Sequence, residues 1–230
     1  MAAGGALIAS EARGEEELRT MMPRDQSGKV PALDKLIDHM RKLTETKNSK
    51  GLEALMLPNF EVEFDGGKGV PGFRKVWKPE SPDSAVWEVL GRVLSIGGAF
   101  YSPTLFAIPY VYTHFPVDLD RLGYVVALGD KVELREKPED GAKVLKTLNN
   151  DILPLAKPFE PPVVIARGTY LEVKHPEFPV SYVEGSGVYS PAGHRLFFEK
   201  RAGKWQWISL VAATMAESPE LLRHGGKARP

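Results

Sequence analysis

Cysteine is absent from this chain of 230 residues. Without a thiol, the chain forms no disulfide, uses no cysteine nucleophile and builds no zinc site with thiolate ligands. The absence leaves the compartment open, because cysteine-free chains suit both a reducing cytosol and an oxidising periplasm.

An excess of charge and a long apolar run are also missing. The 30 basic residues balance the 30 acidic ones, so the net charge is zero and no nucleic-acid partner is predicted. No run reaches the roughly 18 apolar residues of a spanning helix, so we expect no membrane span. The small, apolar segment 1–10 lacks the basic start of a signal peptide. An alternative is that this segment is the trimmed beginning of an exported chain.

The composition that is present belongs to a globular protein. Hydrophobic residues make up 43% and charged residues 26% of the sequence, which is enough to bury a core. At this length we expect one or two domains.

The first half of the chain predicts helices around one strand. Segment 1–30 has little apolar periodicity, and we expect a mobile arm. A helix follows, with one apolar stripe formed by Leu33, Leu36, Ile37, Met40 and Leu43. Alternation at Phe60, Val62 and Phe64 predicts a half-buried strand. Ser81 and Pro82 are typical of a helix start, and the apolar face of that helix runs to Leu94 before Gly97.

Gly67, Gly69 and Gly72 match the spacing of a dinucleotide-binding loop. However, Pro71 removes an amide from the turn that would hold the pyrophosphate, and the following helix ends within two turns at Lys78. We therefore interpret this segment as a strand-to-helix turn.

An aromatic segment extends from Phe100 to Phe115 and is interrupted by prolines, so any strand in it is short or at an edge. Tyr110 and Tyr112 share one face of such a strand, and His114 continues the alternation. These side chains are candidates for a shallow ligand-binding groove. A domain-interface belt of buried rings is the alternative.

Metal and cofactor sites are not predicted. His114, Asp118 and Asp120 are suitable metal ligands, but a divalent ion needs more ligands than these three. We interpret the two aspartates as part of a loop-to-strand junction, and we expect no metal and no cofactor.

Residues 119–185 are predicted to form a small β-barrel, because short β-branched runs alternate with Gly, Pro, Asn and Asp turns. The Val-Glu-Leu-Arg-Glu-Lys-Pro run at 132–138 resembles the Val-Asn-Val-Arg-x-x-Pro signature of bacterial Src-homology-3-like domains. Tyr-Leu-Glu-Val at 170–173 and Ser-Tyr-Val at 181–183 resemble later motifs of that family. This resemblance implies a barrel of five or six strands, common in cell-envelope proteins and often binding peptides or wall glycopeptides.

The end of the chain predicts a β-hairpin over 194–210. Trp205 and Trp207 are expected on one face, and Ile208 and Leu210 on the other. The hairpin, at 197–208, resembles one in nuclear-transport-factor-like cone folds. The preceding Ser-Pro-Ala-Gly-His-Arg turn at 190–195 resembles bacterial proteins with an embedded Src-homology-3-like module. Arg195 belongs to a basic cluster, which is either a solvated hairpin tip or an anion site.

The predicted fold is therefore α+β, with an all-β Src-homology-3-like barrel inserted in a split cone-like domain of helices and antiparallel sheet. The split domain takes residues 31–118 with 186–216, the barrel takes 119–185, and 217–230 is a tail. Because a lone hairpin is not stable, the terminal hairpin is expected to complete the sheet that begins near Phe60.

Function is predicted less sharply than fold. The first hypothesis is a non-catalytic binding or scaffolding protein of the bacterial cell envelope, whose barrel contacts a peptide, protein or cell-wall ligand. Its candidate ligand-binding residues are Tyr110, Tyr112, His114 and Arg195. The alternative is a small cofactor-free hydrolase or isomerase, with His114 and a carboxylate as acid and base in the cone. An assembly subunit that docks by its arms is a third possibility, and the oligomeric state is left open.

Overall fold

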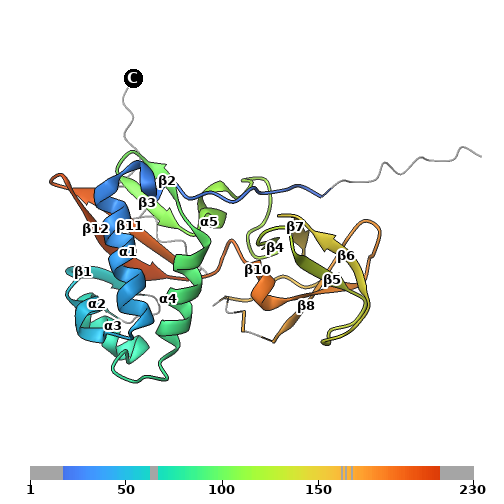
Figure 1. Ribbon diagram of the computed structural model, residues 1–230, viewed down its shortest axis with the longest axis horizontal. Coiled ribbons are helices and arrows are strands. Elements are labelled where there is room, and N and C mark those ends of the chain that lie inside the picture. The colour runs from blue at the N-terminus through green and yellow to red at the C-terminus, as the bar shows by residue number, and fades with distance from the viewer. Residues whose placement is uncertain (1–17, 63–66, 162, 164, 167, 213–230) are drawn as a thin grey trace, which may run out of the picture.

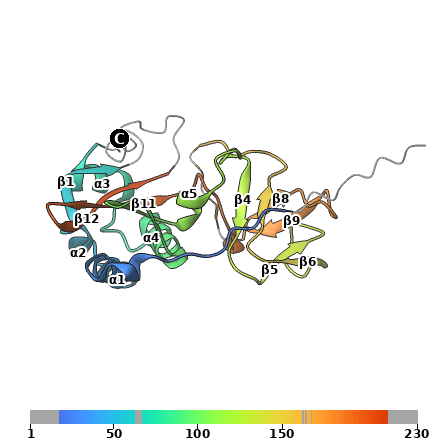
Figure 2. The same cartoon turned by 90° about the horizontal axis from the view of Figure 1, so that it is seen from above.

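The computed structural model describes residues 18–62, 67–161, 163, 165–166 and 168–212, and it is a mixed α+β structure. Two groups of elements lie side by side (Figures 1 and 2). We call the first the main unit; it comprises α1–α5 with strands β1–β3, β11 and β12. The second, the β module, comprises β4–β10. The predicted tail at 217–230 lies outside the described residues.

The main unit has five α-helices and five strands among the described residues. Its helices are α1 (Pro31–Glu45), α2 (Ser49–Glu53), α3 (Gly69–Trp77), α4 (Ala85–Ile96) and α5 (Tyr110–His114). Its strands are β1 (Met56–Val62), β2 (Ala99–Ser102), β3 (Leu105–Ile108), β11 (Arg195–Arg201) and β12 (Lys204–Val211).

The five strands form one sheet in the order β1-β12-β11-β3-β2. The terminal hairpin β11–β12 occupies the middle of this sheet, and β12 pairs in parallel with β1. Helices α1 and α4 pack together over one face (Figure 1). The main core forms there, between the helices and the sheet.

The predicted stripe of α1 is confirmed. Leu33, Ile37, Met40 and Leu43 are buried, and Leu36 is half-buried against the main core. Positions three and four residues apart lie on one side of a helix, so this spacing turns all of them toward the sheet.

Helix α4 begins later than predicted. Its N-cap is Ser84, whose hydroxyl accepts a hydrogen bond from the backbone N–H of Val86 at 3.3 Å. Ser81 instead stands in a turn, and its carbonyl accepts from the indole N–H of Trp87 at 3.2 Å. Both serines suit a cap, and tertiary contacts decide between them.

A β-bulge in the hairpin changes the predicted facing of one residue. Phe197 pairs with Ser209 and Phe198 with Trp207, so Ile208 is the extra residue of the bulge. Alternation restarts after a bulge, which returns Leu210 to the face of Trp207, in the main core. Ile208 lies on the opposite face.

Gly69, from the dinucleotide-like motif, has a structural role. It begins α3 with φ of +63°, and a Cβ there would lie 2.8 Å from the carbonyl oxygen of Pro58. Glycine alone suits both the backbone angle and the close approach.

The β module has two small antiparallel sheets and no closed barrel among its described residues. One sheet has the order β10-β4-β7 and the other β6-β5-β9-β8. Its strands are β4 (Tyr124–Ala127), β5 (Val132–Arg135), β6 (Val144–Leu148), β7 (Ile152–Pro154), β8 (Tyr170–Val173), β9 (Ser181–Glu184) and β10 (Val188–Tyr189). An isolated bridge between Leu155 and Val173 joins the sheets. With strands of two to five residues, the ladders do not run continuously around the core.

Strand β4 is shared by two cores. Val125 and Ala127 face the core of the β module, whereas Val126 faces the main core. A strand buried on both faces reads as a continuous apolar run, which explains Val-Val-Ala at these positions. The β10-β4-β7 sheet therefore forms the boundary between the two units.

A mobile arm was predicted for residues 1–30, of which 1–17 lie outside the described residues. Residues 18–30 contact both units. Met21 and Ser27 are buried, and Thr20 forms an antiparallel bridge with Asp151 of the β module. Gln26 donates its backbone N–H to the carbonyl of Gly98 at 2.9 Å. The segment crosses both units (Figure 1). Strand addition of this kind leaves no apolar period in the sequence, because most of its bonds come from the backbone.

Candidate functional site

Aromatic side chains fill the space between the helices and the sheet of the main unit. Trp207, Phe60 and Phe73 are fully buried there. The ring centroid of Trp207 lies 4.5 Å from that of Phe60 and 6.2 Å from that of Phe73, in edge-to-face geometry. The three rings pack together in the main core.

The predicted alternation of Tyr110, Tyr112 and His114 is wrong, because these residues form the short helix α5. Two positions on a helix differ by about 200° in direction, so the tyrosines point to opposite sides. Tyr110 is buried in the main core, whereas Tyr112 lies across the sheet with Phe197. A five-residue segment is too short for its period to distinguish a helix from a strand.

Two of the predicted ligand-binding residues, Arg195 and Tyr112, are in contact. The guanidinium carbon of Arg195 lies 4.4 Å from the ring centroid of Tyr112, and that of Arg121 lies 4.6 Å away. Tyr112 and Arg195 are 8% and 6% exposed, so this is a buried stack and neither an open groove nor a solvated hairpin tip. The stack holds α5 and the loop after it against the sheet.

His114 lies apart from that stack. Its Nδ1 is 2.8 Å from the hydroxyl of Thr113, and burial together with the nearby cation Arg24 lowers its pKa. Asp118 forms a 2.7 Å ion pair with Arg19, which lowers the pKa of Asp118. Asp120 accepts from the backbone N–H of Leu122 at 3.0 Å. The three residues considered for a metal thus have separate partners.

The turn from Ser190 to Arg195 is buried, although its composition is typical of a surface turn. Every residue from Val188 to Phe198 is buried. The backbone N–H of Gly193 donates to the carbonyl of Ser190 at 2.9 Å, and the hydroxyl of Tyr189 donates to the carbonyl of His194 at 2.5 Å. Burial raises the pKa of Tyr189. Loops normally run over the surface, so these hydrogen bonds are needed to satisfy the backbone of a buried turn.

Arg92, on α4, connects the main unit to the β module. Its guanidinium donates to the carbonyl of Ile165 at 3.1 Å and to those of Gly185 and Val188. The same group lies 5.5 Å from the ring centroid of Tyr189. Bonds from one charged group to three carbonyls set the position of the module against α4.

A cleft follows α4 where the two units meet, and Arg92 lies within it. On one side is a cavity of about 140 Å³, with Glu88, Ser190 and His194 in its wall. On the other side is a wider groove of about 930 Å³, which also reaches Leu128 and Ser186 of the β module. Glu88 and Arg92 line both parts. Clefts between units are common positions for ligand sites.

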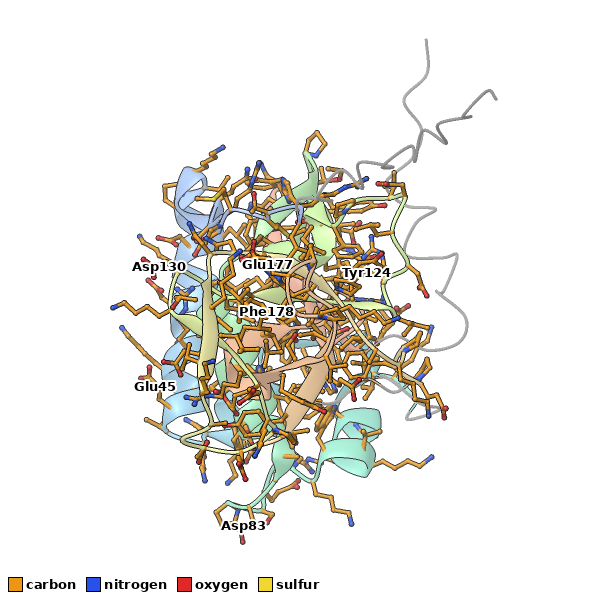
Figure 3. All side chains as sticks on the ribbon, turned by 90° about the vertical axis from the view of Figure 1, so that its right-hand side faces the viewer. Glu45, Asp83, Tyr124, Asp130, Glu177 and Phe178 are labelled. Atoms are coloured by element: carbon orange, nitrogen blue, oxygen red, sulfur yellow. The ribbon has the colours of Figure 1, made fainter. Side chains whose placement is uncertain are left out.

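Charges in the groove balance one another. The cations are Arg41, Lys47 and Arg92, and the acids are Glu45, Asp83 and Glu88. Figure 3 shows Glu45 and Asp83 below Asp130 of the module. A lining with both signs suits a polar or zwitterionic ligand better than a polyanion.

Sequence reasoning missed Glu88 and Arg92 as candidate site residues. Both stand on the polar side of the stripe from Val86 to Leu94, where the pattern predicts only solvent exposure. The sequence feature that could have pointed to this region is the Ser190 turn, because the buried turn packs next to α4. No pattern within the sequence connects that turn to α4.

Comparisons with protein-family models, curated proteins and solved structures found no match for this chain. Among the described residues, no helix is long and apolar enough to cross a membrane.

Proposed function

We propose that this chain is a non-catalytic binding or scaffolding protein of the bacterial cell envelope, which takes a peptide or cell-wall ligand in the cleft along α4. The observation that carries the proposal is the cleft itself, since both units contribute residues to it. A ligand there contacts the helices and the β module together.

The size and charge of the groove support a peptide-like ligand. At about 930 Å³ it is at the upper end of the range of small-molecule sites, which leaves space for a short peptide. Its three cations and three acids complement the alternating amide dipoles and mixed charges of a peptide or wall glycopeptide. The filling of the inner sheet face by Trp207 also favours binding over chemistry inside the main unit.

The proposal also covers the fold of each unit. We infer that the β module is a variant of the Src-homology-3-like barrel, and that the main unit is a cone-like domain split around it. Two short sheets around one aliphatic core support the first inference. The central position of the terminal hairpin in the sheet of the main unit supports the second. The envelope location rests on the resemblance of residues 132–138 to modules found there.

Sedimentation with purified cell-wall sacculi tests the proposal. Gly91 lines the groove, and a Cβ added there meets nothing within 4 Å, so Gly91→Phe places a ring in the groove without backbone strain. We expect the wild type to sediment with sacculi and Gly91→Phe to bind about tenfold more weakly, a loss of about 1.4 kcal/mol.

Lys35→Phe is the matched control, because it places the same ring on the exposed side of α1, outside the groove. It should bind like the wild type. Equal weakening by both substitutions would assign the effect to surface hydrophobicity, and a wild type that stays in the supernatant would refute the proposal.

A small hydrolase is the second candidate, because Glu88, Ser190 and His194 line one cavity. These are the residue types of acid–base and nucleophilic catalysis. If the cavity hydrolyses esters, His194→Gln should lower turnover of p-nitrophenyl acetate at least about 100-fold. Equal rates for the wild type and His194→Gln would exclude His194 as the base.

A further inference from the structure

A short segment near the N-terminus adds to the outer edge of β7. Residues 18–21, which we call the arm strand, form the antiparallel bridge between Thr20 and Asp151. Met21 donates its backbone N–H to the carbonyl of Asn150 at 2.8 Å, and Ile152 donates to the carbonyl of Arg19 at 2.8 Å. The sheet β10-β4-β7 is thereby extended at its β7 edge by one isolated bridge.

Side chains strengthen this attachment. Leu18 packs on the core of the β module, and Met21 is buried in the main core. Arg19 forms the 2.7 Å ion pair with Asp118. The arm strand therefore carries its own recognition pattern, with an apolar residue at each end and a cation between them.

The connection to the rest of the chain is short and exposed. Met22 to Asp25 are all exposed, and Pro23 fixes one backbone angle among them. Beyond them, Gln26 is bound to Gly98 of the main unit. The backbone of the arm strand is thus paired with the β module, and the exposed residues 22–25 lead from it to the main unit. Figure 2 shows the path of this segment between the two units.

We propose that the β7 edge is an interface between copies of this chain, at which the arm strand of one molecule replaces that of another. In such an exchange residues 18–21 make the contacts described above with the other molecule, and the path of residues 22–25 changes. Asp25, which pairs with Arg41 at 3.7 Å and accepts from the backbone N–H of Ser27 at 3.0 Å, marks the end of the exchanged segment. Within one molecule the arm strand competes at an effective concentration on the order of 1 mM, so exchange increases with protein concentration. This interface is independent of the groove along α4.

The cysteine-free sequence allows a clean test by disulfide trapping. One chain carries Thr20→Cys, a second chain of different tagged mass carries Asp151→Cys, and the two are mixed at about 1 mM and oxidised. Residues facing each other in an antiparallel pair are close enough for a disulfide. We expect a mixed dimer that contains one chain of each mass and that decreases on dilution.

The control mixes Thr20→Cys with Thr147→Cys, an exposed position on β6 that faces Glu133 and lies off the β7 edge. The yield of mixed dimer from the Thr20→Cys and Asp151→Cys chains should be at least about five times the yield of this control when the protein concentration is near 1 mM. Yields equal to the control at every concentration would overturn the proposal.

A chain carrying both Thr20→Cys and Asp151→Cys measures the contact within one molecule. It should close an internal disulfide when dilute and give dimers when concentrated. Closure within single molecules at all concentrations, without dimers, would also overturn the exchange while leaving the fold and the groove unaffected.

Discussion

The cores of the two units differ in composition as well as in size. The main core is built around aromatic side chains, among them Phe60, Phe73, Trp207 and Tyr110. The ten buried residues in the core of the β module are all aliphatic: Val125, Ala127, Val132, Leu134, Leu148, Leu153, Leu155, Val173, Val183 and Val188. Large rings bury much more area per residue than valine does, so the main unit holds most of the apolar stabilisation.

This difference explains how the two units are joined. A core of ten aliphatic residues is small for an independent domain, and its strands are short. The β module gains by sharing β4 with the main core and by the bonds from Arg92. We infer that the module depends on the main unit more than the main unit depends on the module.

The largest expected effect comes from ending the chain after Gly187. This truncation removes β11 and β12 from the middle of the five-stranded sheet, together with Trp207. We expect the remaining chain to lose cooperative unfolding and its near-ultraviolet circular dichroism, because β1 and β3 no longer belong to one sheet. A fragment that unfolded cooperatively would contradict the assignment of the hairpin to the main unit.

Matched leucine substitutions compare the cores directly. Leu90→Ala in the main core and Leu134→Ala in the β module each remove a fully buried side chain, at a cost of about 3 kcal/mol. Amide hydrogen exchange should distinguish the two substitutions. Leu90→Ala should raise exchange throughout the chain, whereas Leu134→Ala should raise it first in β5, β6, β8 and β9. Identical exchange patterns would show one cooperative unit instead of two unequal ones.

The connection between the units is tested by Arg92→Met, which keeps most of the side-chain stem and removes the bonds to Ile165, Gly185 and Val188. We expect a loss of about 2 kcal/mol in the free energy of unfolding, because carbonyls lose a charged donor. Thermal unfolding should also separate into two transitions. Arg41→Met, which removes a guanidinium on α1, is the control and should keep a single transition.

The smallest expected effect is a pH dependence of the β module. Burial, and then the nearby cation Lys146, lowers the pKa of His175 from its ordinary value of 6.5. Its Nδ1 accepts from the backbone N–H of Glu177 at 3.1 Å, which requires the neutral ring. The stabilisation is complete above pH 6.5 and is lost as the pH falls through the lowered folded pKa.

Urea unfolding at pH 7.5 and at pH 5 measures this effect. The wild type should lose more stability between the two conditions than His175→Asn, which has no titrating ring at that position. His39→Asn is the control at an exposed histidine of α1 and should behave like the wild type. His175 is buried beside Phe178, although it stands next to Pro176 in a loop.

Sequence patterns predicted elements well where a period repeats several times. The stripe of α1 and the alternation of the terminal hairpin are such cases, and both elements are present. Prediction failed where the segment was short or interrupted. Helix α5 has five residues, and the bulge at Ile208 breaks the alternation from which the facing of Leu210 was predicted.

The sequence by itself determined the absence of thiol chemistry, the balanced charge, the α1 helix and the aromatic hairpin. Only the tertiary structure decided the burial of the Ser190 turn, the placement of Arg92 and the docking of the arm strand. The physical reason is sequence distance. A helical stripe repeats within four residues, whereas Arg92 meets carbonyls 73 and 96 residues away. Such contacts depend on how whole faces pack, and a local period carries no information about them.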